Sequence, residues 1–267
     1  KTRYADGGET VRPLLLLFTL LLAGCVSAPN GNVAQPLSQQ TSKGDKRKRA
    51  QVHADLGYAY YEAQRFSPAL DEARIAIGID SSYALAYNLL GLIYLELHEN
   101  ASGEEAFQRA LQLAPGDPDI SNSYGWFLCQ TGQEQKSQTY FETALRNPLY
   151  ASSGIALLNS ATCALRVKDE ALAIKALNSL LSIDPDNVRG IFLLAEVSFR
   201  GGRYDEARYR LAELYRRIEP TAETAWLSLR VARKLGERGD EARFIALLRQ
   251  KFADSPEAEK LRQGRFE

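Results

Sequence analysis

The sequence contains few of the residues that most often carry out chemistry, with two histidines and three cysteines among 267 residues. His53 and His98 have no cysteine or carboxylate at the spacing of a metal site. No serine or cysteine has a plausible base nearby in the sequence, and no glycine-rich phosphate loop occurs. We therefore expect no enzyme activity, no cofactor, no bound metal and no small-molecule substrate.

An excess of charge of one sign is also lacking, because 33 Lys and Arg residues balance 33 Asp and Glu residues. A balanced chain gives no reason to expect nucleic acid or another polyanion as a partner. Residues 43–49 are a local exception, "KGDKRKR". This basic run either contacts anionic lipid or cell-wall polymer near a membrane, or is the solvated start of a helix.

Long hydrophobic runs are missing too. The apolar stretch over residues 14–22 is shorter than the ~20 residues that a membrane-spanning helix needs. Lys1, Arg3 and Arg12 precede it, and the small residues Ala23 and Gly24 follow it. This order of a basic, an apolar and a small-residue zone predicts a secretory signal peptide over residues 1–24.

The predicted signal peptide ends at Cys25. Its last residues, Leu22-Ala23-Gly24-Cys25, resemble the bacterial lipobox, which implies cleavage before Cys25 and lipidation of that residue by three acyl chains, palmitate among them. Several acyl chains, at ~0.8 kcal/mol per buried methylene, hold a protein on a membrane. Val26 stands where the lipoprotein pattern places Asp for inner-membrane retention, so we expect the periplasmic face of the outer membrane. Residues 25–49 are predicted to form the lipidated N-terminus and a flexible basic tether.

From residue 50 onward the sequence repeats itself. Leu56-Gly57 and Leu90-Gly91 are 34 residues apart, as are Tyr60 and Tyr94, and 34 residues is the tetratricopeptide period. The predicted repeats cover about 50–83, 84–117, 118–151, 154–187, 188–221 and 223–256, with a small loop insertion at Ser152 and Ser153. The predicted fold is all-α, a right-handed superhelical tetratricopeptide-repeat solenoid of about six helix-turn-helix repeats over residues 50–267.

Small, aromatic and proline residues recur at fixed places in these repeats. Small residues such as Gly57, Gly91, Ala161 and Ala195 allow two helices to approach closely, and aromatic residues such as Phe107 fill the space between neighbouring pairs. Prolines are predicted at the ends of the second helices, because proline cannot continue a helix. These prolines are Pro115, Pro148, Pro185, Pro220 and Pro256.

Cys129 and Cys163 fall near the ends of the first helices of the third and fourth repeats. An exported protein reaches an oxidising compartment, in which paired cysteines tend to form disulfides. The two residues occupy unequal repeat positions, twelve and ten, so two readings stay open. They form a disulfide that staples the stack at its middle, or they are two small buried thiols.

The first helix of each pair is expected to line the concave side of the stack. Counting along the repeats predicts an apolar and aromatic strip with interspersed asparagines that suits a peptide segment or helix of another protein. The strip comprises Tyr58, Tyr61, Asn88, Leu92, Leu95, Asn122, Trp126 and Leu158, continued by Phe192 and Phe199. Alternatively, some of these residues pack on one another or on the terminal region of the chain. Arg189, Glu196, Arg200 and Lys234 make the later repeats more polar.

The motifs together resemble a known family, the type IV pilus biogenesis and stability lipoproteins of the PilW/PilF type. The segment "YGWFLCQTG", followed by "NPLY" where the repeat period is interrupted, carries the most specific part of the resemblance. The resemblance implies a pilotin, an outer-membrane lipoprotein that promotes localisation or multimerisation of the pilus secretin, with the early-repeat groove contacting that partner. The alternative is another periplasmic tetratricopeptide-repeat lipoprotein adaptor, which docks cell-wall enzymes or outer-membrane assembly machinery.

Overall fold

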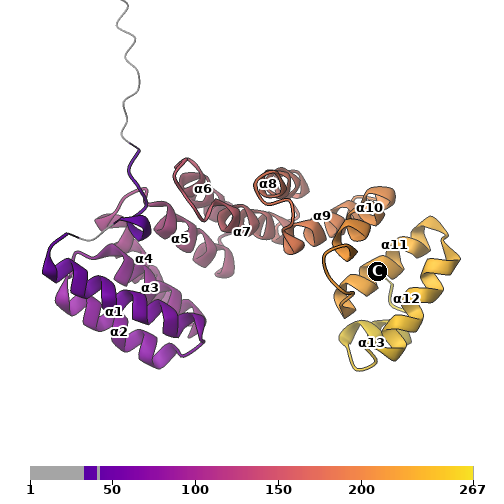
Figure 1. The fold of residues 1–267 in the computed structure, drawn as a ribbon, viewed down its shortest axis with the longest axis horizontal. Helices are drawn as coiled ribbons and strands as arrows, with labels where there is room; N and C mark the ends of the chain where they lie inside the picture. The colour runs from indigo at the N-terminus through magenta and orange to yellow at the C-terminus, as the bar shows by residue number, and fades with distance from the viewer. Residues whose placement is uncertain (1–32, 41–42, 267) are drawn as a thin grey trace, which may run out of the picture. The chain divides into compact units, whose positions relative to one another are not determined.

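The computed structural model describes residues 33–40 and 43–266, and the predictions for the signal peptide, Cys25 and Val26 lie outside these residues. Within them the chain forms thirteen α-helices, one short 3-10 helix and no strand. The helices follow one another as antiparallel pairs in chain order (Figure 1). The predicted fold class, an all-α tetratricopeptide-repeat solenoid, is therefore confirmed.

Twelve of the helices form six pairs. The first helices of the pairs are α1 (Asp45–Glu62), α3 (Ala84–Glu96), α5 (Pro118–Gln130), α7 (Ser153–Arg166), α9 (Val188–Arg200) and α11 (Ala222–Leu235). The second helices are α2 (Phe66–Ile79), α4 (Asn100–Leu113), α6 (Glu134–Leu145), α8 (Glu170–Ile183), α10 (Tyr204–Tyr215) and α12 (Arg238–Gln250). Helix α1 begins at Asp45 and not near residue 50, so most of the basic run lies in its first turns.

The turn inside each pair contains one residue with left-handed backbone geometry, at the same place in every repeat. These residues have φ between 57° and 82°, and they are Gln64, His98, Gly132, Lys168, Gly202 and Gly236. Glycine adopts this backbone geometry without steric cost, whereas the Cβ atom of the other residues makes it unfavourable. His98 is therefore a turn residue of the second repeat.

Small residues on the first helices allow close contact with large side chains on the second helices. A Cβ atom placed on Gly91 would lie 2.7 Å from the Phe107 ring, and one on Gly125 would lie 2.8 Å from the Phe141 ring. Phe107 and Phe141 are fully buried. The space in front of each glycine is thus already filled by an aromatic ring of the partner helix.

The C-terminal end of the stack has a helix that the sequence analysis missed. Pro256 does not end a second helix but is the first residue of α13 (Pro256–Arg262), where its missing N–H costs nothing. Beyond α13, the Phe266 ring stacks on Trp226 at a centroid distance of 5.7 Å, and Arg230 Nε donates to the Phe266 carbonyl at 3.0 Å. This segment covers the last pair of helices.

Residues 33–40, predicted as part of a flexible tether, instead lie against the repeats. Pro36 is buried, and η1 (Leu37–Gln39) follows it. The Leu37 N–H donates to Asp117 Oδ2 at 2.8 Å, and Asn147 Nδ2 donates to the Ala34 carbonyl at 2.9 Å. Two contacts hold the segment. Asp117 caps α5 with one carboxylate oxygen and accepts from the backbone of the segment with the other, and the Leu37 side chain packs against an apolar cluster.

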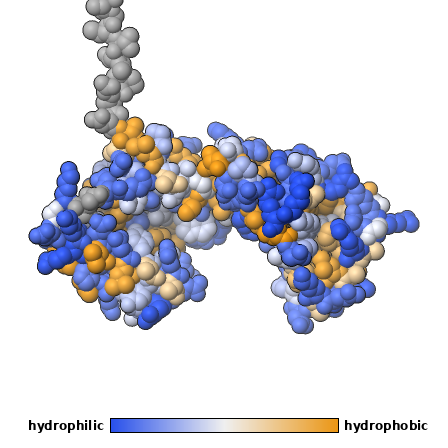
Figure 2. Space-filling model, in the orientation of Figure 1, coloured by the Kyte–Doolittle hydropathy of each residue, from blue (hydrophilic) through white to orange (hydrophobic). Residues whose placement is uncertain are grey.

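None of the helices within the described ranges has both the length and the apolar composition required to cross a bilayer. On the face shown in Figure 2, hydrophobic patches alternate with hydrophilic side chains. Large apolar side chains that remain exposed include Val52, Ile155 and Ile183. The surface therefore combines apolar and polar side chains.

We predict that Gly91→Ala destabilises the protein by about 1–3 kcal/mol, because the added methyl group overlaps the buried Phe107 ring. The matched control is Gly78→Ala, since a Cβ there meets nothing within 4 Å and alanine favours helix by up to about 1 kcal/mol. Urea unfolding followed by circular dichroism measures both variants. Equal midpoints for the two variants would contradict the packing described above.

Candidate functional site

The first helices of the early repeats form a groove with a cavity of about 370 Å³. Its walls come from α1, α3 and α5, and it is closed by Ser38 and by the start of α7. Four of the predicted strip residues line it: Tyr58, Asn88, Leu92 and Asn122. Its other lining residues are Ser38, Gln51, Asp55, Glu62, Tyr83, Leu85, Asp119, Ser123, Tyr150, Ser152 and Ile155. We call this set the acidic groove.

A hydrogen-bonded chain crosses the floor of the acidic groove. The Tyr58 hydroxyl donates to the Leu85 carbonyl at 3.2 Å and accepts from Asn88 Nδ2 at 2.8 Å. Asn88 Nδ2 also donates to Ser123 Oγ at 3.3 Å. Asn88 is only 2% exposed, yet its Oδ1 has no hydrogen-bond partner. The floor thus ends in one unused acceptor.

The carboxylates of the acidic groove are not neutralised by a cation that lines it. Desolvation raises the pKa of Asp119 above its usual range, a hydrogen bond from Ser38 opposes this, and the neighbouring Asp117 adds to it. Desolvation also raises the pKa of Asp55, against a hydrogen bond from Gln51. Burial disfavours the charged form of a carboxyl group, and no nearby positive charge restores it here.

Arg47 is the cation at the rim, and it is already paired. Its Nε lies 2.6 Å from Asp80 Oδ2, and its guanidinium stacks over the Tyr83 ring at 5.3 Å. Desolvation and the Asp55 charge raise the pKa of Tyr83 to about 12, although Arg47 lowers it. The Asp80 carboxyl is also desolvated, but hydrogen bonds from Ser82 and the Arg47 charge hold its pKa below the usual range. Arg47 therefore leaves the carboxylates inside the groove unpaired.

Several residues of the predicted strip do not line the groove. Leu95 packs with Phe107 and Leu128 in the core, and Phe192 and Phe199 pack in the core of the fifth repeat, so the expectation that these three face the groove is wrong. Trp126 and Leu158 are half-buried against neighbouring core clusters. The physical reason is that most faces of a first helix are covered by other helices, and only one narrow face remains free.

Tyr61 also lies outside the groove lining. It is half-buried, with its ring 6.0 Å from Phe66 and its hydroxyl donating to Glu96 at 3.3 Å. Desolvation and the Glu96 charge raise the pKa of Tyr61 to about 12. Its hydrogen bond joins the first repeat to the second, which is a structural role.

The sequence analysis missed the residues that close the groove. Tyr150, Ser152 and Ile155 come from the loop insertion and the start of α7, and Ser38 comes from the docked N-terminal segment. The Ser38 hydroxyl donates to Asp119 Oδ2 at 2.5 Å. The interruption of the repeat period near "NPLY" was the available signal for the insertion. Nothing in the repeat pattern pointed to Ser38.

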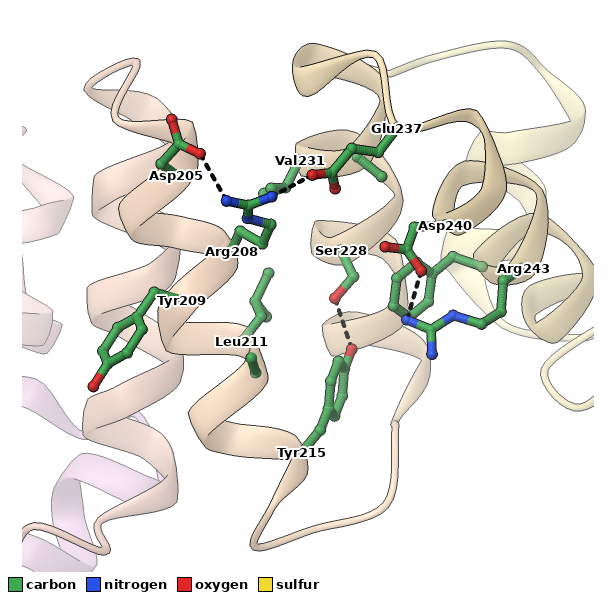
Figure 3. A pocket seen from close by; sticks show the side chains of 13 residues that line it. Asp205, Arg208, Tyr209, Leu211, Tyr215, Ser228, Val231, Glu237, Asp240 and Arg243 are labelled. Carbon is green, nitrogen blue, oxygen red and sulfur yellow. Dashed lines mark hydrogen bonds and ion pairs between the residues drawn. The ribbon is translucent and has the colours of Figure 1, made fainter.

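A second cavity, of about 440 Å³, lies among α10, α11 and α12 (Figure 3). Its charged groups pair with one another: Arg208 binds Asp205 at 3.0 Å and also contacts Glu237, and Arg243 lies 3.1 Å from Asp240. The hydroxyls of Tyr215 and Ser228 share a hydrogen bond of 2.8 Å. Because these polar groups satisfy one another, the cavity serves as a polar seam between repeats.

The charged residues predicted for the later repeats are mostly paired as well. Arg200 binds Glu196 at 2.5 Å, and Arg189 lies 3.5 Å from Glu223. Lys234 is exposed. Exposed ion pairs of this kind contribute up to about 1 kcal/mol each.

Neither histidine lies in a metal-binding arrangement. His53 Nδ1 lies 2.6 Å from Glu72 Oε2, which joins α1 to α2, and His98 is exposed in a turn. Across the described part of the chain no three His, Cys, Asp or Glu side chains are grouped to hold a metal ion.

Cys129 and Cys163 are joined by a disulfide between α5 and α7, with Cα atoms 5.8 Å apart. Both residues are fully buried against Phe141. Arg166 donates to the Cys129 carbonyl at 3.0 Å. The two cysteine side chains thus face each other although they occupy unequal repeat positions. The bond links the third repeat to the fourth.

Comparison with known proteins places the chain among repeat proteins. The tetratricopeptide-repeat family model matches residues 50–118 and 130–188. The type IV pilus assembly protein PilF of Pseudomonas aeruginosa is 24% identical over 249 residues, covering 93% of this chain and 96% of PilF. The structure of PilW, a type IV pilus biogenesis factor, aligns with a TM-score of 0.74 at 27% identity, over 79% of this chain and 97% of PilW. The PilF structure gives a TM-score of 0.74 at 19% identity, over 83% of this chain and all of PilF (100%).

We predict that loss of the disulfide lowers the stability by about 3–4 kcal/mol, because the bond closes a loop between residues separated by 34 positions. The measurement is the unfolding midpoint with and without reductant. In Cys129→Ala/Cys163→Ala the midpoint should no longer respond to reductant. Free thiols at both positions in unreduced, unfolded protein would contradict the bond.

We predict that Asp117→Ala releases residues 33–40, because Asp117 both caps α5 through the Ile120 N–H at 3.1 Å and accepts from Leu37. Amide hydrogen exchange over residues 33–40 should accelerate. Asp169→Ala is the matched control, since Asp169 caps α8 through the Leu172 N–H at 3.0 Å. Both variants lose about 1 kcal/mol of capping energy. Equal exchange of residues 33–40 in the two variants would argue against docking through Asp117.

Proposed function

Because the chain is a tetratricopeptide-repeat protein homologous to the type IV pilus biogenesis proteins PilF and PilW, we propose that it acts as a pilotin. In this role it is an outer-membrane lipoprotein adaptor that binds the pilus secretin. It promotes localisation of the secretin in the outer membrane, its multimerisation, or both, and it does so by binding and not by catalysis.

The observation that carries this proposal is the extent of the match to PilW, which covers 97% of that protein with a TM-score of 0.74. A match of this extent includes the early repeats that form the acidic groove and the later repeats beyond them. Tetratricopeptide repeats are protein-binding scaffolds, and their concave face offers a peptide-binding surface. The acidic groove is therefore the proposed contact site for the secretin.

Lipidation of Cys25 is the proposed membrane anchor. Seven residues, 26–32, separate Cys25 from Val33, where the docked N-terminal segment begins. At about 3.3–3.6 Å per residue, the chain from Cys25 to Val33 spans at most about 30 Å. Since residues 33–40 lie against α5, the acidic groove stays within reach of the membrane surface at which a secretin assembles.

We predict that a strain without this protein loses most of its secretin multimers from the outer membrane. The measurement is immunoblotting of heat-resistant multimers in separated membranes, together with twitching motility. Restoring the wild-type gene should restore both. Cys25→Ala should restore less, because the anchor is missing, although the repeats are unchanged.

Unchanged multimers and unchanged secretin location in the deletion strain would refute the pilotin role. An accompanying defect in cell-wall enzymes or outer-membrane assembly would then support the other adaptor role. The Cys25→Ala result is separate from this, because full restoration by that variant would refute the anchor alone.

A further inference from the structure

The unused hydrogen-bonding capacity of the acidic groove is of one kind. In the structure the Tyr58 hydroxyl gives its single proton to the Leu85 carbonyl and accepts from Asn88 Nδ2. The acceptor Oδ1 of Asn88 is consequently left without a partner in a residue that is 2% exposed. An unpaired buried acceptor costs free energy, and its partial negative charge adds to that of the carboxylates that line the groove.

The charge of the groove is also of one kind. Asp55, Glu62 and Asp119 line it, and none of the described residues in its lining is Lys, Arg or His. Partial desolvation raises the pKa of the half-buried Asp119 and of the exposed Asp55, so a positive charge arriving there would reverse an existing electrostatic cost. The polar seam of α10 to α12 is different, because its own arginines neutralise its carboxylates. Of these two cavities, the acidic groove is the one whose lining, within the described part of the chain, contains no counter-charge.

We propose that the acidic groove binds an extended peptide segment of a partner protein that carries lysine or arginine. The cationic head group meets the carboxylates of Asp55 and Asp119. This inference deepens the proposed function. It rests on that function in one respect, which is that the groove is the site where the partner binds.

The size and walls of the groove fit such a segment. A cavity of about 370 Å³ accommodates a few residues of extended chain and not a helix of about 10 Å diameter. The rings of Tyr83 and Tyr150 line the same cavity as the carboxylates. The size and the charge of the groove thus favour the same class of ligand.

The test is a selection of random peptides displayed on phage against the full-length lipoprotein in detergent. Peptides enriched by the wild-type protein should share a lysine or arginine. Asp55→Asn/Asp119→Asn removes both charges, while an asparagine at position 119 still accepts from Ser38. An enriched synthetic peptide should bind this variant roughly tenfold more weakly, and binding to the wild-type protein should weaken as salt is added.

The matched control is Asp71→Asn/Glu142→Gln, which removes two exposed carboxylates outside the groove. It should bind the enriched peptide as the wild-type protein does. Melting temperatures of both double variants should match that of the wild-type protein, which shows that the fold is kept. Equal binding by the two double variants would overturn the inference, as would enrichment of apolar or acidic peptides or no enrichment at all.

The selection involves no secretin, so its result is independent of the pilotin role. Loss of secretin multimers in the deletion strain together with no cationic enrichment would refute this inference alone. Cationic enrichment together with unchanged secretin would refute the pilotin role alone and leave the chemistry of the groove intact.

Discussion

Contact between a small residue on a first helix and a large side chain on its partner helix sets the distance on which the remaining packing depends. Gly91 lies against Phe107, and Gly125 lies against Phe141, with no room for a methyl group in either contact. Each helix pair packs only against the neighbouring pairs. The distance between the two helices of one pair therefore affects how the next pair packs on it. The second helices pack against one side of the first helices. The other side of the first helices is left free, and the acidic groove lies there.

Two departures from regular repetition turn this free side into an enclosed site. The loop insertion before α7 contributes Tyr150 and Ser152, and the docked N-terminal segment contributes Ser38. Asp117 connects them to the solenoid, because it caps α5 and also accepts from the backbone of Leu37. A perfectly periodic chain would have a concave face without these closing residues. The groove therefore depends on two non-repetitive segments, the loop insertion and the docked N-terminal segment, as well as on the regular helix pairs.

Sequence alone predicted the repeats well because their signals are local. The 34-residue period and the recurring small, aromatic and proline residues can each be found within short stretches of sequence. The groove was predicted only in part, since Leu92 and Leu95 lie within one helical turn and the period does not decide which of them is covered by a neighbour. Contacts between residues that are far apart in the sequence, such as Ser38 and Asp119, produce no periodic pattern in the sequence. Helix α13 was missed because proline suits a helix start as well as a helix end.

The balance of charge over the whole chain conceals an uneven distribution between two cavities. In the seam of α10 to α12, arginines and carboxylates lie together as exposed ion pairs, so the charges are balanced within the protein. In the acidic groove no cation lies among the described residues of the lining, and desolvation of the half-buried Asp119, which raises its pKa, is not offset by a positive charge. A protein retains such a cost where a partner recovers it, because a site that is already satisfied gains little from binding. The lack of a counter-charge, more than cavity size, is therefore the reason that we propose the acidic groove, and not the seam, as the binding surface.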